Sequence, residues 1–203
     1  MVALDPLNFG SGSDPHPLSP AFDQAVAYAL DIHRAQTRKG TSIPYAGHLL
    51  RVAGVVLEEG GSETQAIAAL LHDAVEDQGG APRLADIRKR FGDAVAAIVE
   101  GCTDADTVPK PPWEARKRAY IDHLREAPAE VRLVSCADKL DNARAILADY
   151  RQLGAALWPR FSAPAEQILW YYRALADVFL ARGPHRLAGE LDRVVTELHA
   201  LAR

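Results

Sequence analysis

The chain has 203 residues, which is enough for one well-buried domain and short for two. With 48% hydrophobic residues and a net charge of −4, its composition is ordinary for a globular protein and disfavours a general nucleic-acid binder, which is usually basic. The apolar runs are far shorter than a membrane span, and the first residues lack a secretory signal pattern. The two cysteines have no metal-type spacing, which suits a reducing compartment. We therefore expect a cytoplasmic protein without a membrane or nucleic-acid partner.

Proline and glycine positions separate a short arm from a helical domain. Residues 1–18 predict an irregular or flexible N-terminal arm, and the domain spans 19–203. Ser19 before Pro20 is typical of a helix start, and residues 62–65 have the form of a capping box. Because no alternating strand pattern, internal repeat or linker is found, we predict one all-α domain. The expected helices run over about 20–38, 44–59, 66–76, 83–91, 93–103, 113–125, 128–150, 164–181 and 186–201.

Two segments between these helices, 79–82 and 104–112, contain glycine or several prolines and predict loops. The C-terminal part is rich in aromatic residues. We interpret them as packing against the bundle in preference to a pocket wall or an oligomer interface. They are Trp158, Phe161, Trp170, Tyr171 and Tyr172.

The most informative segment is His72-Asp73-Ala74-Val75-Glu76-Asp77. It belongs to the most apolar predicted helix, where polar side chains are costly unless they are paired or coordinated. Glu76 lies four residues after His72, and Asp77 four after Asp73, so all four side chains can border one cavity. A run of charges is more often a solvated face, but this one continues a buried helix and therefore favours a functional site.

A second polar group interrupts another apolar segment. Residues 131–137 are followed by Asp138 and, one helical turn later, Asn142. Alone, this pattern fits an ordinary amphipathic helix equally well. With His72-Asp73 available, Asp138 becomes the natural distant carboxylate ligand.

Two other features allow more than one interpretation. Composition alone does not choose between His48 and His33 as a further ligand; His33 is in phase with an apolar stripe, which favours a core histidine or a partner behind the ligands. Arg38-Lys39 stands at a predicted helix end. The pair either interacts favourably with the helix dipole and has no further role, or it binds a phosphate or a nucleotide base.

Taken in order, these motifs resemble the HD hydrolase domain of the Rel/Spo alarmone enzymes of the stringent response, and more closely the stand-alone small alarmone hydrolases. The resemblance covers residues 20–150 and implies a single-domain HD-type helical bundle. The matching motifs are His33-x-x-Gln36-x-Arg38-Lys39, Pro44-Tyr45-x-x-His48, His72-Asp73, Glu76-Asp77 and Ala137-Asp138-Lys139-Leu140-x-Asn142.

The resemblance also implies a site. One divalent metal, usually Mn²⁺, is expected on four ligands, while Fe²⁺, Co²⁺, Ni²⁺ or Zn²⁺ would suit the same set. The implied reaction removes the 3′-pyrophosphate of a guanosine alarmone such as ppGpp. The implied metal ligands are His48, His72, Asp73 and Asp138. The groups implied to act on the attacking water are Glu76 and Asp77, and those implied to bind the nucleotide pyrophosphate are Arg38, Lys39 and Asn142, with weaker contributions from Tyr45 and Lys139.

Two residues depart from the pattern. Gly40 replaces a common acidic residue, and Asp141 stands where an aromatic residue or histidine is frequent. We expect both near the base or sugar, which leaves the choice of base open. Alternatives are hydrolysis of ppApp, a nucleoside monophosphate or NADPH, or a non-catalytic nucleotide sensor. The ligand set with Glu76-Asp77 argues against a sensor, and the sequence predicts no oligomeric state.

Overall fold

The computed structural model describes residues 18–104 and 111–202, and every regular element in these ranges is a helix. The β pairing there is one isolated bridge between Thr37 and Pro44. The predicted all-α fold is therefore confirmed. Apart from Leu18, the expected arm at 1–18 lies outside the described residues, as does most of the expected loop at 104–112.

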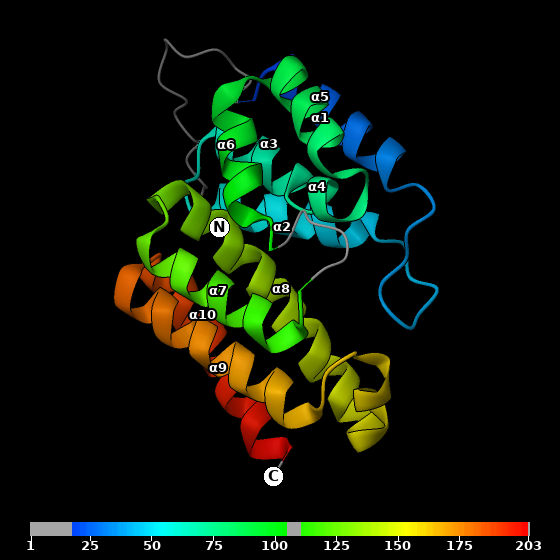
Figure 1. Ribbon diagram of the computed structural model, residues 1–203, viewed down its shortest axis with the longest axis vertical. Coiled ribbons are helices and arrows are strands. Elements are labelled where there is room, and N and C mark those ends of the chain that lie inside the picture. The colour runs from blue at the N-terminus through cyan, green and yellow to red at the C-terminus, as the bar shows by residue number, and fades with distance from the viewer. Residues whose placement is uncertain (1–17, 105–110, 203) are drawn as a thin grey trace, which may run out of the picture.

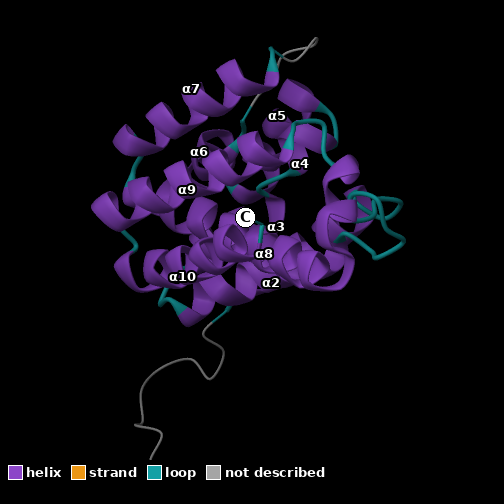
Figure 2. Cartoon of the chain, turned by 90° about the horizontal axis from the view of Figure 1, so that it is seen from below, coloured by secondary structure: helices purple, strands orange, loops and turns teal. Residues whose placement is uncertain are grey.

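The chain forms two groups of helices joined by one long helix. In Figure 1, α1 to α6 lie at one end and α7, α9 and α10 at the other, while α8 runs between them. Helix α8 contacts α2, α3 and α6 in the first group and α9, α10 and η1 in the second. The view in Figure 2 agrees, with α8 among α2, α3, α9 and α10. The elements are α1 (Pro20–Ile32), α2 (Ala46–Glu58), α3 (Glu63–Leu71), α4 (Ala74–Asp77), α5 (Gly80–Phe91), α6 (Asp93–Cys102), α7 (Trp113–Glu126), α8 (Ala129–Leu153), the 3₁₀ helix η1 (Gly154–Arg160), α9 (Ala165–Arg182) and α10 (His185–Leu201).

Local signals place several helix starts where the sequence predicts them. The Ser19 side chain accepts a hydrogen bond from the Ala21 backbone N–H at the start of α1, with Pro20 in the first turn. Ser62 and Gln65 form the predicted capping box at α3. These bonds satisfy N–H groups that have no partner within a helix.

Three predicted helix boundaries are wrong. Helix α1 ends at Ile32 instead of about Arg38, because the backbone turns at His33 and then forms the Thr37–Pro44 bridge. Helix α5 begins at Gly80, inside the expected loop, since a proline in a first helical turn removes no hydrogen bond. The apolar stripe alone could not reveal either change.

The third correction concerns the motif itself. The predicted helix over 66–76 is two helices, and His72-Asp73 lies in the break between α3 and α4. The last four carbonyls of α3 therefore have no partner within the helix. One of them, the carbonyl of Ala69, accepts a hydrogen bond from His72 Nδ1 at 2.7 Å.

The expected aromatic packing is confirmed in the C-terminal part. Tyr171 and Tyr172 are buried, and Trp158, Phe161 and Trp170 pack against the core. None of the helices in the described ranges combines the length and the apolar character needed to cross a bilayer.

Candidate metal centre

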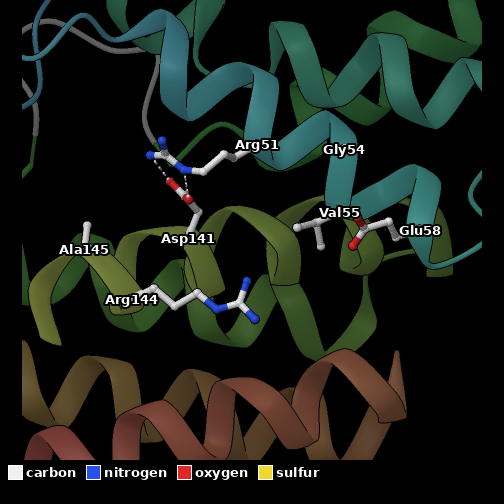
Figure 3. Close-up of a pocket in the computed structure, with 7 residues that line it drawn as sticks. All are labelled: Arg51, Gly54, Val55, Glu58, Asp141, Arg144 and Ala145. Carbon is white, nitrogen blue, oxygen red and sulfur yellow. Dashed lines mark hydrogen bonds and ion pairs between the residues drawn. The ribbon is translucent and has the colours of Figure 1, made fainter. Parts of the chain in front are cut away.

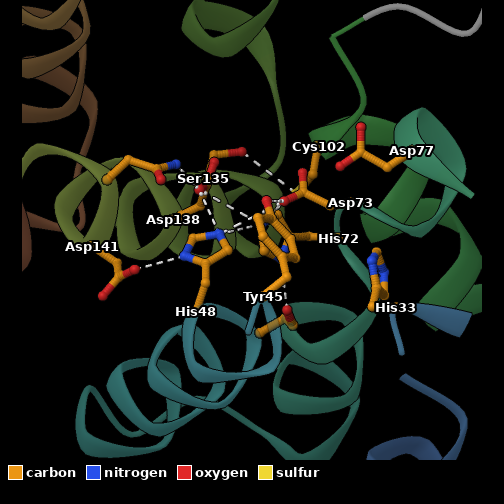
Figure 4. A network of polar contacts seen from close by, with 12 residues as sticks. His33, Tyr45, His48, His72, Asp73, Asp77, Cys102, Ser135, Asp138 and Asp141 are labelled. Carbon is orange, nitrogen blue, oxygen red and sulfur yellow. Dashed lines mark hydrogen bonds and ion pairs between the residues drawn. The ribbon is translucent and has the colours of Figure 1, made fainter. Parts of the chain in front are cut away.

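Three segments far apart in the sequence bring nitrogen and oxygen ligands to one point. His48 comes from α2, His72 from the break after α3, and Asp138 from α8; one ligand atom of each lies within 4.8 Å of the others. The two Nε2 atoms are 3.3 Å apart, and Asp138 Oδ1 lies 3.3 Å from His48 Nε2 and 3.6 Å from His72 Nε2. All three side chains are buried (Figure 4).

Asp73, the fourth predicted ligand, lies beside this group. Its Oδ2 is 3.1 Å from His72 Nε2 and 3.6 Å from His48 Nε2. The same oxygen accepts a hydrogen bond from the Tyr45 hydroxyl. Burial and the charge of Asp73 raise the pKa of Tyr45 far above its ordinary value, so this hydroxyl stays protonated and donates. Tyr45 therefore holds Asp73 close to the two imidazoles.

Both imidazoles are oriented through their other ring nitrogen. His72 Nδ1 donates to the Ala69 carbonyl at 2.7 Å, and His48 Nδ1 contacts Asp141 Oδ2 at 2.6 Å. Each contact directs the opposite nitrogen, Nε2, to the centre. A histidine that binds a metal usually has such a partner on its other nitrogen.

The electrostatics of the centre favour positive charge among ionised carboxylates. Burial lowers the pKa of His48, but hydrogen bonds with the neighbouring carboxylates, Asp138 first, outweigh burial and raise this pKa to about 9. Burial raises the pKa of Asp138, yet Lys139 and the two imidazoles hold it well below its ordinary value. A divalent cation meets the same demand for positive charge, and imidazole nitrogens with carboxylate oxygens suit first-row transition metals. The residues present therefore fit such an ion.

The two acidic residues that follow the motif face different neighbours. Glu76 Oε1 lies 3.8 Å from Arg116 Nη1 of α7, whereas Asp77 Oδ2 accepts a hydrogen bond from Gln36 Nε2 at 2.8 Å. Gln36 also contacts His33 Nδ1 at 2.6 Å. His33 is buried, as its place in the apolar stripe predicts, and it lies in the network around Asp77.

The residues predicted to bind substrate lie in three places. Arg38 Nη1 donates to Asn142 Oδ1 at 2.9 Å, and its guanidinium lies 5.9 Å from the centre of the Tyr45 ring. Lys39 points to a separate place, with Nζ 5.8 Å from the centre of the Phe161 ring. Lys139 Nζ instead donates to Asp138 Oδ2 at 2.5 Å.

A family model described as HD domain matches residues 25–161. The chain belongs to the HD domain family. Curated relatives include the guanosine-3′,5′-bis(diphosphate) 3′-pyrophosphohydrolase MESH1 of Xenopus tropicalis, 40% identical over 124 residues, which are 60% of this chain and 66% of the relative. The protein of the same name from Drosophila melanogaster is 35% identical over 129 residues, 62% of this chain and 69% of the relative.

Solved structures extend the likeness beyond the matched segment. A structure described as a metazoan ortholog of SpoT that hydrolyses ppGpp superposes with a TM-score of 0.74 and 27% identity, covering 92% of this chain and 98% of that chain. The family model ends at residue 161, before α9 begins. The likeness in fold to this solved structure therefore covers most of the chain and extends beyond residues 25–161, which the HD family model matches.

The HD domain of this chain also has charged residues near the site that the sequence analysis missed. Arg116 and Lys117 of α7 both pair with Asp104, and Arg116 reaches Glu76. Burial and then the nearby charge of Lys139 lower the pKa of Lys117. A signal was present in the basic run 116–118, but on a polar helix such a run is usually a solvated face.

The two departures from the family pattern, Asp141 and Gly40, contact other residues of the chain. Asp141 contacts His48, and Arg51 donates to both of its carboxylate oxygens. Burial raises the pKa of Asp141, but the His48 and Arg51 hydrogen bonds lower it to about 2. Gly40 adopts a φ of 72°, and a Cβ there would come within 2.9 Å of Arg160. Gly40 therefore serves a tight turn against Arg160.

Proposed function

We propose that this chain is a metal-dependent guanosine-3′,5′-bis(diphosphate) 3′-pyrophosphohydrolase. The observation that carries the proposal is the convergence of His48, His72 and Asp138, with Asp73 beside them, in an HD domain. Relatives that are 35–40% identical carry the name of this activity, and the neighbouring structure is described as a ppGpp hydrolase.

The metal proposed for this centre is Mn²⁺. His48 and His72 would supply Nε2, and Asp73 and Asp138 would each supply a carboxylate oxygen. When bound, a divalent ion lowers the pKa of water to near neutrality and neutralises charge on phosphoryl oxygens. The hydrogen bonds from Tyr45 and from the two Nδ1 atoms support the proposal, because they hold the ligand side chains in one arrangement.

The residues around the centre divide the remaining work. Glu76, in the short α4 helix, would orient the attacking water and accept its proton. Asp77 would assist from its hydrogen bond with Gln36. Arg38, beside Tyr45 and Asn142, would hold the nucleotide base by stacking or by its planar fork.

The proposed reaction consumes one water. Its oxygen bonds to the phosphorus attached to the ribose 3′ oxygen, the bond between that phosphorus and the 3′ oxygen breaks, and the 3′ oxygen gains a proton. GDP and pyrophosphate leave. Lys139 and Lys39 would offset the charge of the substrate phosphates. The proposed location is the cytoplasm. Cys102 and Cys136 are free and buried, which suits a reducing compartment, and the proposed substrate is an intracellular nucleotide.

The first test measures pyrophosphate release by metal-stripped protein that is resupplied with Mn²⁺, with ppGpp and ppApp in parallel. We expect Mn²⁺-dependent release from ppGpp with GDP as the second product. Asp73→Ala should lose turnover while the circular dichroism spectrum stays that of the folded protein. Folded, metal-loaded protein that releases no pyrophosphate from ppGpp would overturn the proposal, and release from ppApp alone would change the base. Full activity of Asp73→Ala would refute the ligand assignment.

A further inference from the structure

The imidazole of His48 is held at both ring nitrogens by the same helix. Asp138 Oδ1 lies 3.3 Å from Nε2, and Asp141 Oδ2 lies 2.6 Å from Nδ1. Asp138 and Asp141 are three residues apart on α8, so they share one helix face. Both carboxylates are buried. Helix α8 therefore supplies a predicted ligand and, one turn later, an acceptor behind the neighbouring ligand.

The Asp141 carboxylate is itself fixed by a second residue of α2. Arg51 stands three residues after His48 and donates from Nε to Asp141 Oδ1 at 2.5 Å and from Nη2 to Oδ2 at 3.1 Å (Figure 3). A guanidinium that donates to both oxygens of a carboxylate leaves it little freedom to rotate. Because an ionised carboxylate only accepts hydrogen bonds, Nδ1 of His48 must carry a proton. A bound metal would then take the place of the proton on Nε2, whose lone pair faces the centre.

We propose that Asp141 is a positioning residue that fixes the tautomer and the ring orientation of His48 toward the metal, with Arg51 holding the Asp141 carboxylate in place. This inference rests on the proposed metal centre and concerns a position where this chain departs from the pattern of the family it resembles. Where the family frequently has an aromatic residue or histidine, this chain has Asp141, whose carboxylate contacts the Nδ1 atom of His48. Such partners typically contribute about 10–100-fold to metal affinity or activity.

His72 provides an internal reference, because its Nδ1 donates to the Ala69 backbone carbonyl. No side-chain substitution removes that acceptor. The Arg51–Asp141 pair, by contrast, borders a surface pocket of about 500 Å³ between α2 and α8, together with Glu58 and Arg144. The Arg51 side chain is 55% exposed, so it can be replaced without opening a cavity in the core.

The test compares Mn²⁺ affinity among metal-stripped full-length variants by isothermal titration calorimetry. We expect Asp141→Ala to weaken Mn²⁺ binding about 10–100-fold. Asp141→Asn, which keeps an acceptor oxygen, and Arg51→Gln should weaken it less. The matched control is Asp192→Ala, which breaks a half-buried ion pair between Asp192 of α10 and Arg173 of α9 and should leave Mn²⁺ affinity unchanged. Unchanged affinity in folded Asp141→Ala would overturn the inference.

A second measurement uses the wild-type chain and does not depend on how the variants fold. In protein loaded with diamagnetic Zn²⁺, long-range ¹H–¹⁵N spectra should show His48 with its proton on Nδ1 and a metal-induced shift at Nε2. A proton on Nε2, or a metal-induced shift at Nδ1, would overturn the inference. Failure of the proposed function gives a different result. In that case the protein binds Mn²⁺, and Asp141→Ala weakens that binding, but no pyrophosphate is released from ppGpp. A wild-type chain that binds no Mn²⁺ would overturn both.

Discussion

Among the described residues, the part of the molecule from α1 to α8 contains six buried polar or charged residues, whereas the buried side chains of the α9–α10 hairpin are apolar or tyrosine. Five of the six lie in or next to the candidate metal centre or the network around Asp77, and Ser135 bonds to the Tyr120 hydroxyl. The hairpin packs on α8. The bundle therefore has one part that carries a polar centre and one that contributes mainly apolar contact.

This difference has a physical reason. A buried polar group costs free energy unless it is hydrogen-bonded or coordinated, so a polar cluster persists where its members satisfy one another or bind an ion. The buried apolar side chains of the hairpin need no hydrogen-bond or metal partners in this way. They include Leu187, Leu191 and Leu198, which have almost no exposed surface. We thus expect substitutions in the first part to change chemistry and substitutions in the second part to change stability.

The largest expected effect is on turnover. Glu76→Gln removes the group proposed to accept the proton of water and should lower kcat about 10²–10⁴-fold, while Mn²⁺ affinity stays close to that of the wild type. Steady-state kinetics on ppGpp and a Mn²⁺ titration measure both quantities. Glu130→Gln, an exposed carboxylate at the start of α8, is the matched control. If Glu76→Gln loses Mn²⁺ in proportion to its activity, Glu76 is a ligand instead.

The hairpin should show the opposite behaviour. Leu191→Ala truncates a fully buried side chain of α10 and should lower the free energy of unfolding by about 2–5 kcal/mol, because it leaves a cavity. Urea denaturation measures this change, and the kcat of the folded fraction should be unchanged. Leu180→Ala, at an exposed position of α9, should have a much smaller effect. A lower kcat in fully folded Leu191→Ala would show that the hairpin also shapes the site.

The smallest expected effect concerns ion pairs on the hairpin surface. Arg151 and Glu197 join α8 to α10 at 2.5 Å, and Arg144 and Glu190 do the same at 2.5 Å. Side chains in the first pair are 54% and 47% exposed, so water and salt screen the attraction. Glu197→Gln should therefore change the free energy of unfolding by less than about 1 kcal/mol, and less in high salt. A larger loss that persists in high salt would mean that this pair is coupled to the core.

The sequence by itself determined the helical fold and most helix positions, because the 3.6-residue spacing of apolar side chains and the caps at Ser19 and Ser62 are local signals. It also determined the chemical types at the site. Imidazole and carboxylate groups in an apolar segment, at 72 and 73, are costly without partners, and Asp138 after a second apolar segment is the natural distant carboxylate. The motif resemblance added His48 as an expected ligand. Their roles as ligands stay proposals that the experiments above address.

Only the tertiary structure decided which groups meet. His48 and His33 are both buried, yet packing of α2 on α8 brings His48 to Asp138 and Asp141, while His33 bonds to Gln36. Helical spacing specifies the face on which a residue lies within one helix, but contacts such as that between His48 and Asp141, 93 residues apart, depend on how two helices pack. The end of α3 before His72, which frees the Ala69 carbonyl, likewise depends on contacts that no local pattern contains.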